Sequence, residues 1–147
     1  MKIEIVNSSG KRIPREFLQE LDQIVRPKIL LKLTSVRMKK LLKKDLVLVF
    51  VDKIYAKKLN TSFRKRNYAT DVLSFSPIED ASFGELVFCY DVVRAQAKEH
   101  GLSFKSELSY LYIHGVLHLL GFDHEKNKAE ARKMFAIQDQ IFASLRS

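Results

Sequence analysis

The chain has 147 residues and a mass of 17.1 kDa, the size of one domain that buries about two thirds of its unfolded surface. Its composition is that of a globular protein, and it contains no apolar run long enough for a transmembrane helix. The single cysteine, Cys89, excludes a disulfide framework and a cysteine-rich zinc site, and the first residues do not resemble a secretory signal. We therefore expect one domain over residues 1–147, located in the cytoplasm and not associated with membranes.

The net charge of +9 is concentrated in one part of the chain. Residues 26–66 contain fourteen Lys or Arg and two acids, Asp45 and Asp52, so this segment carries +12 while the other 106 residues sum to −3. A one-sided charge of this kind is typical of proteins with a polyanionic partner such as nucleic acid. It is also compatible with a solvated basic face that binds nothing, so charge alone leaves both interpretations open.

The first third of the sequence predicts one strand followed by helices. Lys2–Val6 alternates isoleucine with charged residues, which is typical of a strand. Pro14 begins an amphipathic segment whose apolar residues recur at helical spacing. Residues 28–44 also have a helical pattern, with a break near Thr34-Ser35 where the serine could cap a new helix.

The middle of the sequence predicts three short strands. Leu46–Val51 is a continuous aliphatic run that indicates a buried strand, and Ile54–Phe63 then predicts a short helix. Val72–Phe75 ends before Pro77, which favours an edge or terminal strand. Leu86–Tyr90, after a glycine, predicts a further strand.

The last third of the sequence predicts three helices. Asp91–His100 should end at Gly101, Ser103 should cap a helix that runs to Gly121, and Asn127 should begin the final helix. The expected fold class is therefore α+β, or mixed α/β, with a sheet of roughly four strands surrounded by helices. The final helix offers five apolar residues to the core: Met134, Phe135, Ile141, Phe142 and Leu145.

Three of the four histidines lie within eleven residues and form a metal-binding pattern. His114 and His118 are one helical turn apart, about 40° around the axis, and Gly121 could end the helix and turn His124 back toward them. The pattern H-x-x-x-H-x-x-G-x-x-H has the spacing of the metzincin zinc site. Ordinary core histidines are the alternative, but Leu108–Leu120 has no formally charged residue, and two unpaired imidazoles in so apolar a helix would be costly.

Three neutral ligands leave a coordination position open, which favours a catalytic over a structural site. Gly115 stands where metalloproteases of this pattern carry their general base, a glutamate, so a conventional peptidase mechanism lacks its base. Phosphodiester cleavage depends on charge stabilisation and alignment at least as much as on a strong base. Because three neutral histidines leave the ion its full double positive charge, the site suits an anionic substrate such as a phosphodiester. The candidate general bases are Glu107, Asp123 and Glu125, although Asp123 could equally orient a histidine ring, and His100 is expected to cap a helix rather than bind the metal.

Three blocks of the sequence resemble the YbeY family of bacterial ribosomal-RNA maturation endoribonucleases. His-Gly-x-x-His-Leu-x-Gly-Phe-Asp-His at 114–124 resembles the family signature. Asn60, Arg64 and Thr70–Phe75 resemble a second family block, and Gly84–Val87 resembles a third, with glutamate in place of the usual aspartate. The sequence departs from the family pattern between Arg64 and Thr70 and before Pro77, where a serine intervenes, and it matches poorly over residues 26–44.

The resemblance implies a mixed four-stranded sheet, a metzincin-like metal helix and one Zn²⁺ held by His114, His118 and His124, although three histidines could by geometry alone also bind Ni, Cu or Co. It implies a single-strand-specific endoribonuclease that matures the 3′ end of 16S ribosomal RNA and acts in ribosome quality control, with small-subunit ribosomal RNA and the ribosome as partners. In this interpretation Arg64 and His114 are catalytic. The cations expected to contact RNA are Arg64, Lys65 and Arg66, and the guanidinium of Arg64 could hold a phosphate through two hydrogen bonds. The alternatives are another metal-dependent hydrolase and a zinc-stabilised ribosome-assembly factor without catalytic activity.

Overall fold

The computed structural model describes residues 2–64, 70–77 and 82–145, in which four strands and six helices form a mixed α/β fold. This confirms the expected fold class. None of the described helices is both long and apolar enough to cross a membrane. The elements are β1 (Ile3–Asn7), α1 (Arg15–Lys32), α2 (Val36–Leu42), β2 (Asp45–Val51), α3 (Lys53–Arg64), β3 (Val72–Phe75), β4 (Ser82–Cys89), α4 (Tyr90–Glu99), α5 (Phe104–Leu120) and α6 (Lys128–Leu145).

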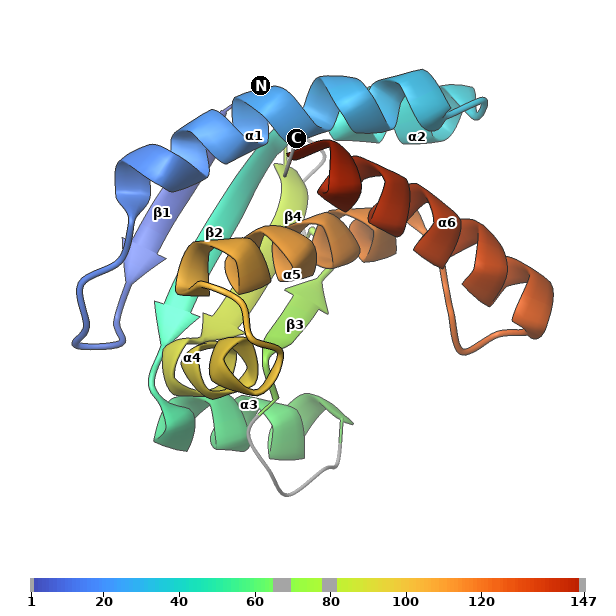
Figure 1. Cartoon of the computed structure of the whole chain (residues 1–147). Helices are drawn as coiled ribbons and strands as arrows, with labels where there is room; N and C mark the ends of the chain where they lie inside the picture. Colours follow the sequence, from blue (N-terminus) through green and yellow to red (C-terminus); the bar gives the residue numbers. More distant parts are fainter. Residues whose placement is uncertain (1, 65–69, 78–81, 146–147) are drawn as a thin grey trace.

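The strands form one sheet in the order β1-β2-β4-β3 (Figure 1). β1, β2 and β4 are parallel, and β3 lies antiparallel to β4 at the edge of the sheet. Pro77, which follows β3 and has no N–H, therefore interrupts no hydrogen bond in the centre of the sheet. Side chains alternate across the sheet. Leu48 and Leu86 pack on one face in the main core with α1 and α5, whereas Val51 and Val87 pack on the other face with α3.

Backbone chemistry explains where α5 begins and ends. The hydroxyl of Ser103 accepts a hydrogen bond from the N–H of Ser106, and Gly121 adopts the left-handed conformation with a φ of 111°. The N–H of Phe122 then donates to the carbonyl of Leu117 and closes the helix end. Both predicted boundaries of this helix are confirmed, and the tight end fixes the direction in which the chain leaves it.

The boundaries of other elements differ from expectation by small amounts with clear causes. α1 continues through Pro27, which has no N–H to donate to the carbonyl of Gln23. Both residues are exposed, so water can satisfy this carbonyl, while Val25 and Ile29 are buried and hold the helix against the core. Gly84 lies inside β4 rather than before it. A Cβ at this position would come within 2.6 Å of the Phe75 carbonyl oxygen, so the absence of a side chain lets β3 approach.

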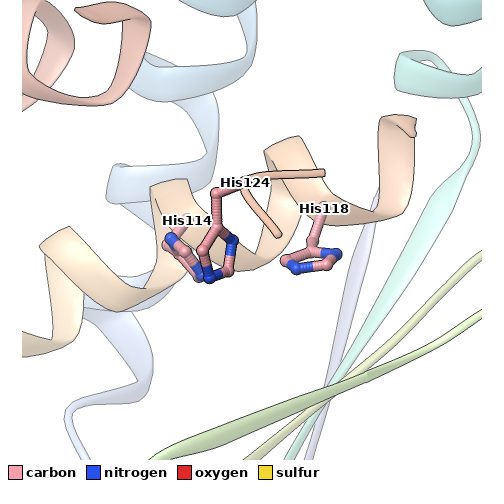
Figure 2. A group of neighbouring side chains, drawn as sticks. All are labelled: His114, His118 and His124. Carbon is pink, nitrogen blue, oxygen red and sulfur yellow. The ribbon is translucent and has the colours of Figure 1, made fainter. Parts of the chain in front are cut away.

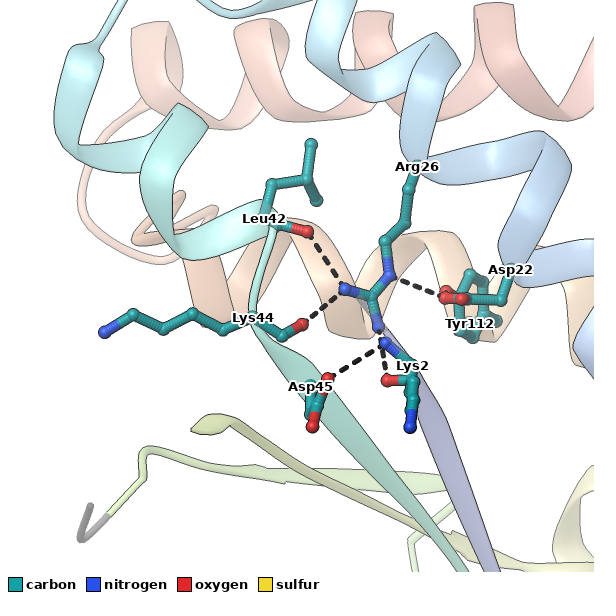
Figure 3. A network of polar contacts seen from close by, with 7 residues as sticks. All are labelled: Lys2, Asp22, Arg26, Leu42, Lys44, Asp45 and Tyr112. Carbon is teal, nitrogen blue, oxygen red and sulfur yellow. Dashed lines mark hydrogen bonds and ion pairs between the residues drawn. The ribbon is translucent and has the colours of Figure 1, made fainter. Parts of the chain in front are cut away.

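A buried guanidinium joins α1 to the ends of neighbouring elements (Figure 3). Arg26 is 1% exposed, and its Nε donates to the carboxylate of Asp22 at 2.7 Å. The hydroxyl of buried Tyr112, on α5, donates to the same carboxylate. The guanidinium also donates to three backbone carbonyls, those of Lys2, Leu42 and Lys44. Arg26 is thus a structural cation within the basic segment and is not available to a polyanion.

Candidate metal centre

Three histidines converge on one point beside the sheet (Figure 2). His114 and His118 project from α5, and His124 returns to them from the turn that follows. The ring centroids form a nearly equilateral triangle, 5.6 Å from His114 to His118, 5.2 Å from His114 to His124 and 5.5 Å from His118 to His124. One nitrogen from each ring lies within 4.8 Å of the other two, so a single ion could bind all three.

The turn after α5 is held by its own hydrogen bonds and by a buried anchor. Phe122 is only 4% exposed and packs in the main core, which draws the chain back after Gly121. The carboxylate of Asp123 accepts the N–H of Glu125 at 2.9 Å and tightens the loop around His124. From α2, the guanidinium of Arg37 donates to the carbonyl of Leu120 at 3.4 Å, close to the same helix end.

The residues present fit a metal ion of the zinc type. Three imidazoles are a donor set that Zn²⁺ binds readily, and no fourth His, Cys, Asp or Glu joins the group in the described part of the chain. Burial lowers the pKa of His114, which keeps this ring neutral and its lone pair available at neutral pH. The Nδ1 of His124 is buried without a hydrogen-bond partner among the described residues, a state that costs free energy unless a bound group satisfies the ring.

The centre lies on the wall of a cleft of about 300 Å³ between α5 and the edge strand β3. Phe135 from α6 lies against the centre, with its ring 6.2 Å from that of His114 and 5.6 Å from that of His124. This phenylalanine was expected in the core and instead lines the cleft, because α6 runs along α5 from Tyr110 toward His114 and places its first half beside the histidines. The cleft is lined by Thr70, Asp71, Val72, Ser74, Tyr110, Leu111, His114, Gly115, His118, His124, Glu125 and Phe135.

The structure separates the three candidate general bases. Glu107 is 2% exposed, and its carboxylate lies 2.6 Å from the Nδ1 of His100, away from the cleft lining. Asp123 holds the turn, whereas Glu125 lines the cleft. His100 caps the end of α4, as expected, and takes no part in the histidine cluster.

The predicted RNA-contacting cations lie at the limit of the described residues. Arg64 is the last residue of α3, but its side chain is outside the described part, as are Lys65 and Arg66 entirely. The chain re-enters the described part at Thr70 and Asp71, and both line the cleft. The roles of these three cations remain predictions.

Two residues of this site were missed by the sequence analysis. Asp71 lines the cleft and belongs to the Thr-Asp-Val-Leu-Ser-Phe block. An acidic residue directly before a predicted strand, within a block shared with the family, could have indicated it. Gln138 is fully buried on α6, and its Oε1 lies 3.1 Å from the Nδ1 of His114. A polar residue on the same helical stripe as the buried Met134 and Ile141 was the signal in that case.

Comparison with known proteins identifies the family. The family model described as "Endoribonuclease YbeY" matches residues 5–146. The chain belongs to the YbeY family of endoribonucleases. It is 49% identical to the "Endoribonuclease YbeY" of Bdellovibrio bacteriovorus, over 99% of this chain and 95% of that protein. It is 38% identical to the protein of the same name from Thermotoga neapolitana, over 88% of this chain and 78% of the relative.

A solved structure agrees with the fold of this YbeY family member. The solution structure of TM1509 from Thermotoga maritima superposes with a TM-score of 0.60 at 27% identity, covering 98% of this chain and 91% of that one. The range matched by the family model, residues 5–146, includes the segment 26–44, which had resembled the family poorly in sequence. The expected family and fold are therefore confirmed.

Proposed function

We propose that this chain is a single-domain, metal-dependent endoribonuclease that cleaves single-stranded RNA, with zinc held by His114, His118 and His124. The substrate we propose is small-subunit ribosomal RNA near its 3′ end, bound on the ribosome in the cytoplasm. Membership of the family named "Endoribonuclease YbeY" supports the reaction class. The observation that carries the proposal is the cluster of three histidine nitrogens within 4.8 Å on the wall of a cleft.

A cluster of three ligands at a cleft favours catalysis over a purely structural role. Structural zinc sites are normally closed by four protein ligands, and the described residues provide three. A bound zinc ion would supply Lewis-acid stabilisation of a phosphate and would lower the pKa of a water molecule. Asp71 and Glu125 line the same cleft, so we propose that one of these carboxylates would orient or deprotonate such a water molecule and that Phe135, which also lines the cleft, stacks with a nucleobase next to the reacting phosphate.

Arg64 is the cation that we propose for the reacting phosphate. α3 ends at this residue, and the chain becomes part of the cleft wall six residues later at Thr70. A guanidinium on this short connection could donate two parallel hydrogen bonds to phosphate oxygens, which a lysine could not do. Lys65 and Arg66, next along the connection, would contact neighbouring phosphates.

The basic segment divides into structural and available cations. Arg26 is buried against Asp22 and is structural, whereas Arg37 donates to the carbonyl of Leu120 at the end of α5 but is itself exposed. The exposed lysines of α2 and α3, and of the turn after α2, are the ones that can bind flanking phosphates: Lys40, Lys43, Lys53, Lys57 and Lys58. If four to six cations contact phosphates, affinity for single-stranded RNA should fall roughly a hundredfold between about 50 and 200 mM salt.

The decisive experiment joins metal analysis to RNA cleavage. Purified protein should contain about one zinc per chain and cut a single-stranded RNA at internal positions. His118→Ala should lose both zinc and cleavage, whereas Arg64→Ala should keep zinc and lose most cleavage. Cleavage by metal-free His118→Ala protein, freed of contaminating nuclease, would exclude the proposed centre. Activity on peptides or small phosphoesters instead of RNA would identify another hydrolase, and zinc binding with no cleavage of any substrate would identify an assembly factor.

A further inference from the structure

A buried amide stands directly behind the metal centre. The side chain of Gln138 is fully inaccessible to solvent, and its Oε1 lies 3.1 Å from the Nδ1 of His114. The neighbouring positions on the same face of α6 are apolar, namely Met134 and Ile141. The amide is therefore a polar group at a position where the helix otherwise supplies core packing.

The direction of this hydrogen bond decides which nitrogen of His114 can bind a metal. A carbonyl oxygen can only accept, so Nδ1 carries the ring proton and Nε2 keeps its lone pair for an ion. The reverse orientation, with the amide nitrogen against Nδ1, would put the proton on Nε2 and block metal binding. The bond also restrains rotation of the imidazole, as hydrogen bonds to the second nitrogen of zinc-binding histidines generally do.

The same residue carries a cost that packing does not explain. The Nε2 of Gln138 is buried and has no hydrogen-bond partner among the described residues. An unsatisfied buried donor lowers the stability of the folded state, and methionine would fill a similar volume without that donor. Methionine would also leave the Nδ1 of His114 without its acceptor, so the two effects offset each other and stability alone gives no preference for an amide at this position.

We propose that Gln138 is a positioning residue of the metal centre, whose carbonyl oxygen fixes the tautomer and orientation of His114 for metal binding. This inference rests on the proposed function only in requiring that the three histidines bind a metal. It predicts that the amide contributes to zinc affinity with little net effect on the stability of the metal-free protein. A purely structural role predicts a loss of stability when the amide is replaced and no effect on affinity.

The test measures zinc dissociation constants by competition with a chromophoric chelator. Gln138→Met removes the acceptor at nearly constant volume, and we expect affinity to fall about 10–100-fold. Gln138→Glu keeps an acceptor and adds charge, so its affinity should equal or exceed that of the wild type. Gln140→Met is the matched control, because Gln140 lies on the same helix but is exposed and pairs with Lys32. Its zinc affinity should not change.

Urea unfolding of the metal-free proteins provides the second measurement. Gln138→Met should unfold at a urea concentration close to that of the wild type, which separates loss of zinc affinity from loss of folding. If Gln138→Met does not fold, Gln138→Leu takes its place in both measurements. Unchanged affinity in a folded apolar variant would overturn the inference, and so would an affinity loss in Gln138→Glu as large as in Gln138→Met. Absence of zinc binding by the wild type would instead refute the proposed function, and with it the basis of the inference.

Discussion

Replacing Arg26 by methionine tests whether part of the basic segment is structural. Methionine fills much of the same volume, so the main loss is the charge and its hydrogen bonds. The substitution leaves the carboxylate of Asp22 buried without its cation and removes the donors from three backbone carbonyls. Breaking a buried ion pair from one side generally costs about 3–5 kcal/mol. For a chain of this length each kcal/mol lowers Tm by about 2–4 °C, so we expect a decrease of roughly 6–20 °C.

Thermal and urea unfolding of metal-free protein measure this loss directly. Arg94→Met is the matched control, because Arg94 is exposed and donates to the hydroxyl of Tyr90, and its effect should stay within about 0.5 kcal/mol. Adding Asp22→Asn to Arg26→Met removes the stranded charge, so the double variant should be more stable than Arg26→Met alone. A loss below about 1 kcal/mol in Arg26→Met would show that the buried network does not support the fold as argued.

Three further predictions concern charge and packing. The Glu107 carboxylate raises the pKa of His100 through a hydrogen bond and its charge, so the stability gained from protonated His100 is complete below the ordinary pKa of about 6.5 and is lost as pH rises through the folded value. In urea unfolding without metal, the advantage of wild type over His100→Gln should therefore shrink from acid to alkaline pH, and a constant difference would contradict this. Lys40→Gln combined with Lys43→Gln should reduce the slope of log affinity against log salt for single-stranded RNA by about 1.4, as measured by fluorescence anisotropy; an unchanged slope would remove these two lysines from the RNA surface. Gly115→Ala should lower the free energy of unfolding by up to about 2 kcal/mol, since overpacking outweighs the gain in helix propensity, and a more stable variant would refute the close packing.

The local elements could be predicted because each is encoded by its own residues. Ser35 accepts the N–H of Met38 and starts α2, and Asn127 accepts the N–H of Glu130 at the start of α6, as the capping patterns indicated. The histidine cluster was predictable for the same reason, since a helix and a glycine turn are enough to bring the three rings together. These inferences needed no knowledge of the rest of the fold.

The features that the sequence did not reveal depend on contacts between distant segments. Gln138 and Phe135 reach the metal centre because α6 packs along α5, and sequence spacing says nothing about that packing. Glu107 lies on the metal helix at a plausible spacing from His114, but the end of α4 brings His100 against it instead. Likewise, a positive charge such as Arg26 cannot be classed as exposed or buried until its partner is known.

The packing of α5 against the sheet bears on Gly115, the residue that stands where metalloproteases have a glutamate. A Cβ at Gly115 would lie 2.7 Å from the Cδ2 of Leu86, a fully buried residue of β4. A side chain at this position would therefore overlap the Leu86 side chain. The glutamate that serves metalloproteases as a base would require either Leu86 to rearrange in the core or the helix, with His114 and His118, to move away from β4. The close packing at Gly115 thus accompanies the lack of a protease base, and the carboxylates that line the cleft in the described part of the chain come from the turn after α5 and from the segment before β3, namely Glu125 and Asp71.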